Sequence, residues 1–372
     1  MPSEVVDLFT ELAALPSPPG EERAVADSVM RYLRDLGLTV DEDEAGSKVG
    51  SNIGNLYCRL EPTGGGSPIF LCAHLDTVPP TAAIEPVLED GVIRNGAGTI
   101  LGADNKSAVA VMLEGARRVL AENRPHGGIE LLFTPKEEVG LLGAAAFDHE
   151  RLRARLGYVY DQAAPIGEVI LGAPFSRAMQ VRFHGRAAHS GMYPEEGRSA
   201  IAAAARAISD LRLGRVDEET TANVGIIQGG TAGNIIPEWC SLDAEARSHD
   251  EQKLEGLVQE MVDSFAFAAG LEDCEVETKI SKSYKGYRFK TEDPVVRIAH
   301  TALERSGYAP TYALSGGAAD ANVFNERGLA CLNLANGMQD IHTADERITV
   351  EDLEGMVEVT LALVDVARDA DA

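Results

Sequence analysis

Residues 68–77, PIFLCAHLDT, decide the fold of this chain. Their first half is an uninterrupted apolar run, which predicts a strand buried on both faces, as in parallel sheets. His74 and Asp76 follow where this strand would end. A lone histidine there would more simply be a buried structural residue. Because alternate residues of an extended chain point to the same side, Asp76 can orient His74, and we interpret His74 as a metal ligand.

Acidic residues follow two further predicted elements. The apolar run 129–133 precedes Glu137 and Glu138, and the segment GADNK places Asp104 before a predicted helix. Taken singly, they have plainer interpretations, as solvated acids and a helix N-cap. Neighbours in an extended chain point in different directions, so one glutamate can bind metal while the other accepts a proton. Together these ligand types indicate a hydrolase whose nucleophile is a metal-activated water.

Two later residues are weaker candidates when taken alone. Asp161 ends the strand-like YVY and could equally be a turn residue, and His342 lies in a late polar loop. The SGG at 315–317 lacks the form of a nucleophile elbow. The glycine-rich stretches do not match a phosphate-binding loop.

The order of predicted elements favours two domains, as does a length of 372 residues. Strands alternate with helices in residues 1–174 and again in 289–372, which predicts an α/β catalytic domain with a mainly parallel sheet. Residues 175–288 predict a smaller inserted α+β domain with four strands and two helices. Within the first part, we expect residues 141–155 to be mostly helical.

Composition excludes several classes of function. A net charge of −26 repels phosphate backbones and anionic membranes, which argues against nucleic-acid and membrane partners. Aromatic residues make up only 5% of the chain, with a single Trp239, which argues against a base-stacking platform. Five dispersed cysteines, the absence of a CxxC pair and an acidic N-terminus without signal-peptide features predict a cytoplasmic protein.

Six motifs, taken together, resemble the aminoacylase-like dinuclear zinc exopeptidases, which include peptidase T, carboxypeptidase G and succinyl-diaminopimelate desuccinylase. In chain order they are AHLDT, GADNKSAVA, TPKEEVGLLGA, GRAAHSG, GGTAGNIIPE and IHTADERI. The resemblance covers nearly the whole chain. It implies a zinc-exopeptidase catalytic domain, with the inserted domain serving as a lid and as the contact of a homodimer.

The resemblance also implies a ligand for each metal position. His74 and Asp161 would hold one Zn²⁺, Glu138 and His342 would hold the second, and Asp104 would bridge both. The same ligand types also suit Co²⁺ or Mn²⁺. The peptide bond after the bridging aspartate is often cis in this family.

Catalytic and substrate-binding roles follow from the same resemblance. Glu137 would be the general base for a metal-bridging water, and Asp76 would orient a metal-binding histidine. In the inserted domain, His189 would stabilise the oxyanion, commonly in the partner subunit's active site. Arg247 would bind a substrate carboxylate, and Asn234 would lie near the substrate.

Within this family, the residues of the motifs are most similar to those of peptidase T. TPKEEVG and the aspartate at 161 favour cleavage of the N-terminal amide bond of short peptides, as in a di- or tripeptide aminopeptidase. Lys136, where an acid is usual, and the QAA at 162–164 depart from that pattern. The alternative is an N-acyl amino acid amidohydrolase that uses the same two-zinc site. A non-catalytic binding protein is disfavoured because no expected ligand is missing.

Overall fold

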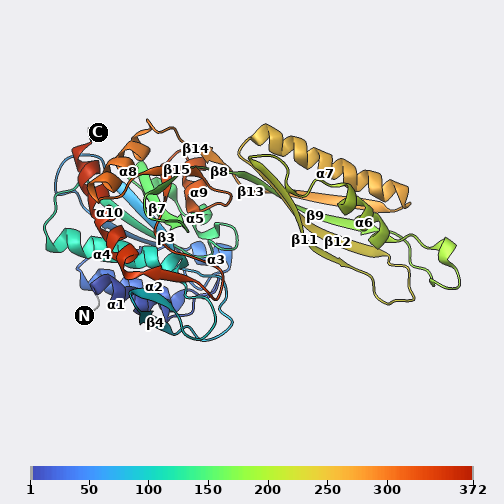
Figure 1. The fold of residues 1–372 in the computed structure, drawn as a ribbon, viewed down its shortest axis with the longest axis horizontal. Helices are drawn as coiled ribbons and strands as arrows, with labels where there is room; N and C mark the ends of the chain where they lie inside the picture. Colours follow the sequence, from blue (N-terminus) through green and yellow to red (C-terminus); the bar gives the residue numbers. More distant parts are fainter. Residues whose placement is uncertain (1–2, 371–372) are drawn as a thin grey trace. The chain divides into compact units, whose positions relative to one another are not determined.

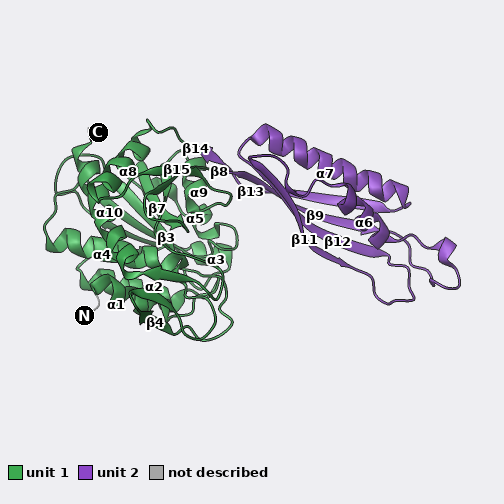
Figure 2. Ribbon diagram, viewed as in Figure 1, with its two compact units in different colours: residues 1–172, 288–372 green, residues 173–287 purple. Residues whose placement is uncertain are grey.

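The computed structural model describes residues 3–370 and contains two compact units (Figure 2). Unit 1 comprises residues 1–172 and 288–372, and unit 2 comprises residues 173–287. The sequence had predicted these divisions after residues 174 and 288. Among the described residues, no helix is both long and apolar enough to cross a membrane.

A mainly parallel sheet forms the centre of unit 1, which confirms the predicted α/β class. Its strand order is β1-β2-β6-β3-β7-β16-β8-β14, and β15 pairs with β8. The parallel core consists of β3 (Ile69–His74), β6 (Ile129–Thr134), β7 (Leu156–Gln162) and β16 (Ala330–Ala335). The other strands are β1 (Val40–Glu42), β2 (Leu56–Leu60), β8 (Glu168–Ala173), β14 (Tyr287–Arg288) and β15 (Thr311–Leu314).

Helices cover both faces of this sheet (Figure 1). One layer contains α1 (Glu4–Ala13), α2 (Arg23–Asp35), α4 (Ala103–Ala121), α8 (Pro294–Arg305) and α10 (Val350–Asp369). The other contains α3 (Ala45–Val49), α5 (Leu142–Ala146) and α9 (Asp320–Glu326). Strand β3 is buried on both sides because its residues alternate: Leu71 joins the core beneath α4, while the ring of Phe70 lies 4.9 Å from that of Phe324 in α9.

A small separate sheet, β17-β5-β4, completes unit 1. It is formed by β4 (Pro86–Glu89), β5 (Val92–Asn95) and β17 (Arg347–Thr349). Strand β17 directly precedes α10, so the sheet ties the end of the chain to the region before α4.

The helix expected over residues 141–155 was wrong for most of its length. Only α5 is α-helical, followed by a single 3₁₀ turn, η1 (His149–Arg151), and an extended segment. The buried carboxylate of Glu130 explains the difference, because it accepts hydrogen bonds from the backbone N–H groups of Arg153 and Ala154 at 3.0 and 2.8 Å. These donors are therefore satisfied without a helix.

Unit 2 is an antiparallel sheet with helices against one face. Its strand order is β10-β11-β12-β9-β13. The strands are β9 (Phe175–His184), β10 (Gly214–Arg215), β11 (Thr220–Gly229), β12 (Trp239–Ser248) and β13 (Glu275–Tyr284). The helices are α6 (Ala200–Asp210) and α7 (Glu251–Leu271), and a 3₁₀ turn, η2 (Pro194–Glu196), precedes α6. Alternate residues of β9, Met179, Val181 and Phe183, are buried in the core with the helices.

Candidate metal centre

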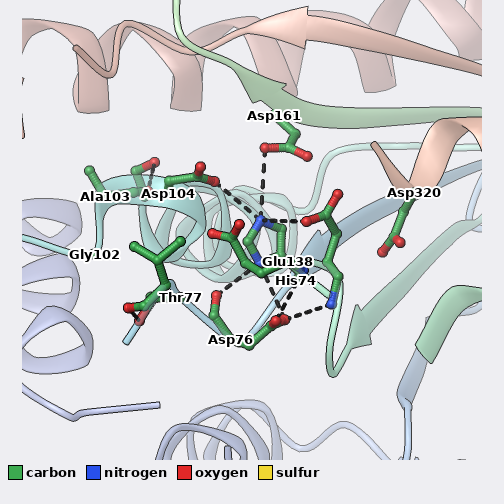
Figure 3. Close-up of polar contacts among 12 residues, drawn as sticks. His74, Asp76, Thr77, Gly102, Ala103, Asp104, Glu138, Asp161 and Asp320 are labelled. Atoms are coloured by element: carbon green, nitrogen blue, oxygen red, sulfur yellow. Dashed lines mark hydrogen bonds and ion pairs between the residues drawn. The ribbon is translucent and has the colours of Figure 1, made fainter. Parts of the chain in front are cut away.

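The predicted metal ligands of unit 1 gather at the carboxyl end of the parallel strands (Figure 3). His74 is the last residue of β3, Asp161 lies near the end of β7, and Glu138 follows β6. Asp104 lies in the first turn of α4, and His342 lies between β16 and β17. Ligand sites of open α/β sheets form at this edge.

Asp104 lies between the two histidines and presents one oxygen to each. Its Oδ1 is 3.1 Å from His74 Nε2, and its Oδ2 is 3.1 Å from His342 Nε2. Glu138 Oε1 is 3.1 Å from His342 Nε2, and Asp161 Oδ1 is 3.8 Å from His74 Nε2. The arrangement therefore has a His74–Asp161 side and a His342–Glu138 side that share Asp104. The Asp104–Asn105 peptide bond is cis.

These residues fit divalent cations in both chemistry and spacing. Imidazole nitrogens and carboxylate oxygens bind zinc at about 2.0–2.2 Å, which places the ligands of a tetrahedral ion about 3.3–3.6 Å apart. The four separations between candidate ligand atoms run from 3.1 to 3.8 Å and so bracket this range. Buried carboxylates at this density require compensating positive charge.

Without a cation, protonated histidines would supply this charge. Hydrogen bonds with Asp104 and Glu138 raise the pKa of His342 to about 10. Burial opposes protonation of His74, but hydrogen bonds with Asp104, Asp161 and Asp76 raise its pKa well above the ordinary value. Binding of a cation releases such protons, so metal affinity should increase with pH.

Asp76 supports the centre through its backbone and its side chain. The His74 Nδ1 atom lies 2.8 Å from the backbone oxygen of Asp76 and 3.5 Å from its carboxylate. That carboxylate accepts the backbone N–H groups of Glu137 and Glu138 at 2.9 and 3.1 Å. Asp76 therefore holds the two glutamates as well as facing His74, which sequence reasoning did not anticipate.

Glu137 lies beside the candidate ligands. Its Oε2 is 4.0 Å from His74 Nε2, and the residue is buried. Burial raises the pKa of Glu137 well above its ordinary value, although nearby His74 acts in the opposite direction. A carboxylate oxygen of Glu137, one of Asp161 and a ring nitrogen of His74 form a close group of possible ligand atoms.

Sequence reasoning assigned no role to two buried polar residues that support the centre. Asn333 in β16 accepts the backbone N–H of Asp161 at 2.9 Å and donates to its backbone oxygen at 2.8 Å. Asp320, at the start of α9, accepts the hydroxyl of Thr134 at 2.5 Å. The available signal for Asp320 was an acid three positions after the glycine pair at 316–317, but its partner on β6 cannot be read from the sequence.

Lys136 does not take part in the ligand cluster. Its φ of 58° lies in the left-handed region, and its Nζ donates to the backbone oxygen of Val49 at 2.9 Å, at the end of α3. A cation at the C-terminal end of a helix is favourable. The lysine found here in place of an acid therefore binds the end of α3 and not the candidate metal centre.

The three predicted residues of unit 2 do not all lie together. His189 and Asn234 are brought close, because the backbone N–H of Ser190 donates to the backbone oxygen of Asn234 at 3.0 Å. Arg247 lies near the other end of β12, opposite Ser176 at the start of β9, and pairs with Glu245 at 2.9 Å.

Comparison with known proteins gives two family matches. Residues 176–270 match the peptidase dimerisation domain of the M20 peptidases, and residues 55–181 match peptidase family M28.

Similar proteins cover nearly the whole chain. The solved structure of aminopeptidase PepT from Bacillus cereus is 38% identical, covers 98% of both chains and has a TM-score of 0.90. A tripeptidase from Staphylococcus aureus is 34% identical, with 99% of this chain and 98% of that chain covered and a TM-score of 0.94. Peptidase T from Vibrio parahaemolyticus is 29% identical over 95% of this chain and 93% of its own.

Proposed function

Because this chain belongs to the M20 family of metal-dependent peptidases, we propose that it is an aminopeptidase that cleaves the N-terminal amide bond of di- and tripeptides. One observation carries the proposal: a single carboxylate, Asp104, presents separate oxygens to two histidines at 3.1 Å each. The similarity to PepT and to a tripeptidase supports the substrate class.

The proposed centre holds two divalent cations, with zinc as the first candidate. His74 and Asp161 would hold one, His342 and Glu138 the other, and Asp104 both. Bound cations would supply Lewis-acid polarisation of the substrate carbonyl and lower the pKa of water.

Glu137 is the proposed general base. Its Oε2 accepts a proton from the attacking water and later delivers it to the leaving amine. The carboxylate of Asp76 fixes the Glu137 backbone through the 2.9 Å hydrogen bond, which limits where Oε2 can lie. His189 is proposed to stabilise the oxyanion, and Arg247 and Asn234 to bind the substrate.

We further propose a cytoplasmic homodimer formed through unit 2. Strand β10 pairs only with residues 221–222, so the rest of β11 forms an edge of the described sheet. Ile226 and Ile227 on this edge are 49% and 51% exposed. An apolar edge strand is a surface that a second copy can cover. All five cysteines are unpaired, which supports a reducing compartment.

The substrate test uses zinc-reconstituted protein with Ala-Ala, Ala-Ala-Ala, Ala-Ala-amide and N-acetyl-Ala, each with and without chelator. We expect chelator-sensitive release of N-terminal alanine from the three peptides. Cleavage of N-acetyl-Ala alone would replace the proposal with an amidohydrolase. No hydrolysis by a protein with two bound metals would contradict both.

The general-base test compares Glu137→Gln with Glu150→Gln, an exposed glutamate in η1 that loses the same charge. We expect the first variant to bind zinc while its kcat falls about 10²–10⁴-fold, the usual contribution of a general base. Wild-type turnover by Glu137→Gln would refute this role.

A further inference from the structure

The backbone before the regular part of α4 needs hydrogen-bond acceptors from outside the helix. Gly102 has a left-handed φ of 79°, and Asp104 and Asn105 depart from helical angles. No local side chain caps this end of the helix. The amides of residues 101–104 are buried, and buried N–H groups are costly when they lack an acceptor.

Glu346 supplies acceptors to three of these amides. Its Oε2 accepts the N–H groups of Leu101 and Gly102, both at 2.7 Å, and its Oε1 accepts that of Asp104 at 2.9 Å. The Glu346 side chain comes from more than 240 positions along the chain and is 1% exposed. Hydrogen bonds to an ionised carboxylate are the stronger kind.

These bonds join two segments that carry ligands of the candidate centre. The backbone N–H of Asp104 itself donates one of them. His342 stands in the loop that leads to Glu346, and the Glu346 N–H donates to Thr343 within that loop at 3.3 Å. Glu346 therefore joins the segment that carries Asp104 to the loop that carries His342. Between these two residues, Asp104 Oδ2 lies 3.1 Å from His342 Nε2.

We propose that Glu346 is a positioning residue that sets Asp104 opposite His342 and so maintains the affinity of the centre for its cations. The proposal rests on the proposed two-metal function. It gives Glu346 no contact with substrate or metal. The role needs a carboxylate, because a glutamine has one acceptor oxygen and its NH₂ group would face at least one of the three N–H donors.

The experiment compares Glu346→Gln with Glu354→Gln, an exposed glutamate of α10 that loses the same charge. Metal-free proteins are followed by hydrogen exchange at single amides, and Zn²⁺ binding is measured by calorimetry. In Glu346→Gln we expect faster exchange at residues 101, 102 and 104, with the β-strands unchanged. We expect Zn²⁺ affinity about 10–100-fold weaker, the usual cost of losing support for a ligand. The control should match the wild type.

Glu346→Asp keeps both acceptor oxygens on a shorter side chain and provides the measurement if Glu346→Gln does not fold. If both variants fold, Glu346→Asp should bind Zn²⁺ more tightly than Glu346→Gln. If only Glu346→Asp folds, its Zn²⁺ affinity should fall less than the roughly 10–100-fold expected for loss of the carboxylate. Unchanged exchange at residues 101, 102 and 104 would refute the hydrogen-bonding role. Faster exchange with unchanged Zn²⁺ affinity would refute positioning. If wild-type protein binds no Zn²⁺, the proposed function fails, while exchange of the metal-free protein still reports on the Glu346 contacts.

Discussion

Replacement of Asp76 by asparagine tests how the two glutamates are held. The Asp76 carboxylate is fully buried and accepts two backbone N–H groups, from Glu137 at 2.9 Å and Glu138 at 3.1 Å. In Asp76→Asn, one of its two acceptor oxygens becomes an NH₂ group. One backbone donor then loses its bond to a charged acceptor, which costs about 1.5–3 kcal/mol of the free energy of unfolding.

The Asp76→Asn variant should also bind Zn²⁺ about 10–100-fold more weakly, since Glu138 is a proposed ligand. Urea unfolding of the metal-free protein measures the stability. Circular dichroism follows both units, whereas the fluorescence of the single Trp239 follows unit 2. A loss seen in circular dichroism but not in fluorescence therefore locates the effect in unit 1.

Asp35→Asn is the matched control, because Asp35 is exposed at the end of α2 and loses the same charge. It should leave both urea transitions and Zn²⁺ affinity unchanged. An Asp76→Asn protein with wild-type stability and wild-type Zn²⁺ affinity would refute the argument, because neither backbone donor would then depend on the carboxylate.

Three further perturbations test other parts of the molecule. Burial lowers the pKa of His126, so its contribution to the free energy of unfolding is present above pH 6.5 and lost as the pH falls. In urea titrations between pH 7 and 5, His126→Gln should therefore lose less unfolding free energy than the wild type, by ~1.4 kcal/mol for each unit by which the pKa is lowered. An identical pH profile for the two proteins would contradict this. Gly157→Ala would place a Cβ 2.0 Å from Phe70 Cζ and should cost about 1–3 kcal/mol in the unfolding free energy; a neutral result would mean that the ring moves freely. Chelation of zinc-loaded protein should abolish hydrolysis and lower the Tm in calorimetry, with free Zn²⁺ at a hundred times Kd worth about 2.7 kcal/mol; an unchanged Tm and activity would argue against bound metal.

The pattern of apolar residues along the chain was enough to predict the central strands and the fold class. The apolar runs at 68–72 and 129–133 correspond to β3 and β6, the two parallel neighbours at the centre of the sheet. The alternating order of strands and helices predicted the α/β class. The helix predicted over residues 141–155 was wrong for most of its length, because Glu130 in β6 accepts backbone N–H groups that a helix would have used.

The site depended more on contacts between distant segments. The positions of His74, Glu137 and Glu138 after strands could be predicted, because strand ends of a parallel sheet meet at one edge. The roles of Asn333 and Glu346 could not, because each acts through a hydrogen bond to a backbone far away in the sequence. Such pairings follow from the packed sheet and leave no periodic signal in a single sequence.

The order of ligands along the chain has a consequence for synthesis. Glu138 and His342 lie 204 positions apart, and the whole of unit 2 is made between them. At about 5–20 residues per second, roughly 10–40 s pass between the two residues on the ribosome. Throughout this interval the nascent chain carries Glu137 and the earlier ligands but lacks His342. A chain that stalls within unit 2 would therefore be released without a complete set of the proposed ligands, so on the proposed function incomplete products should not degrade peptides in the cell.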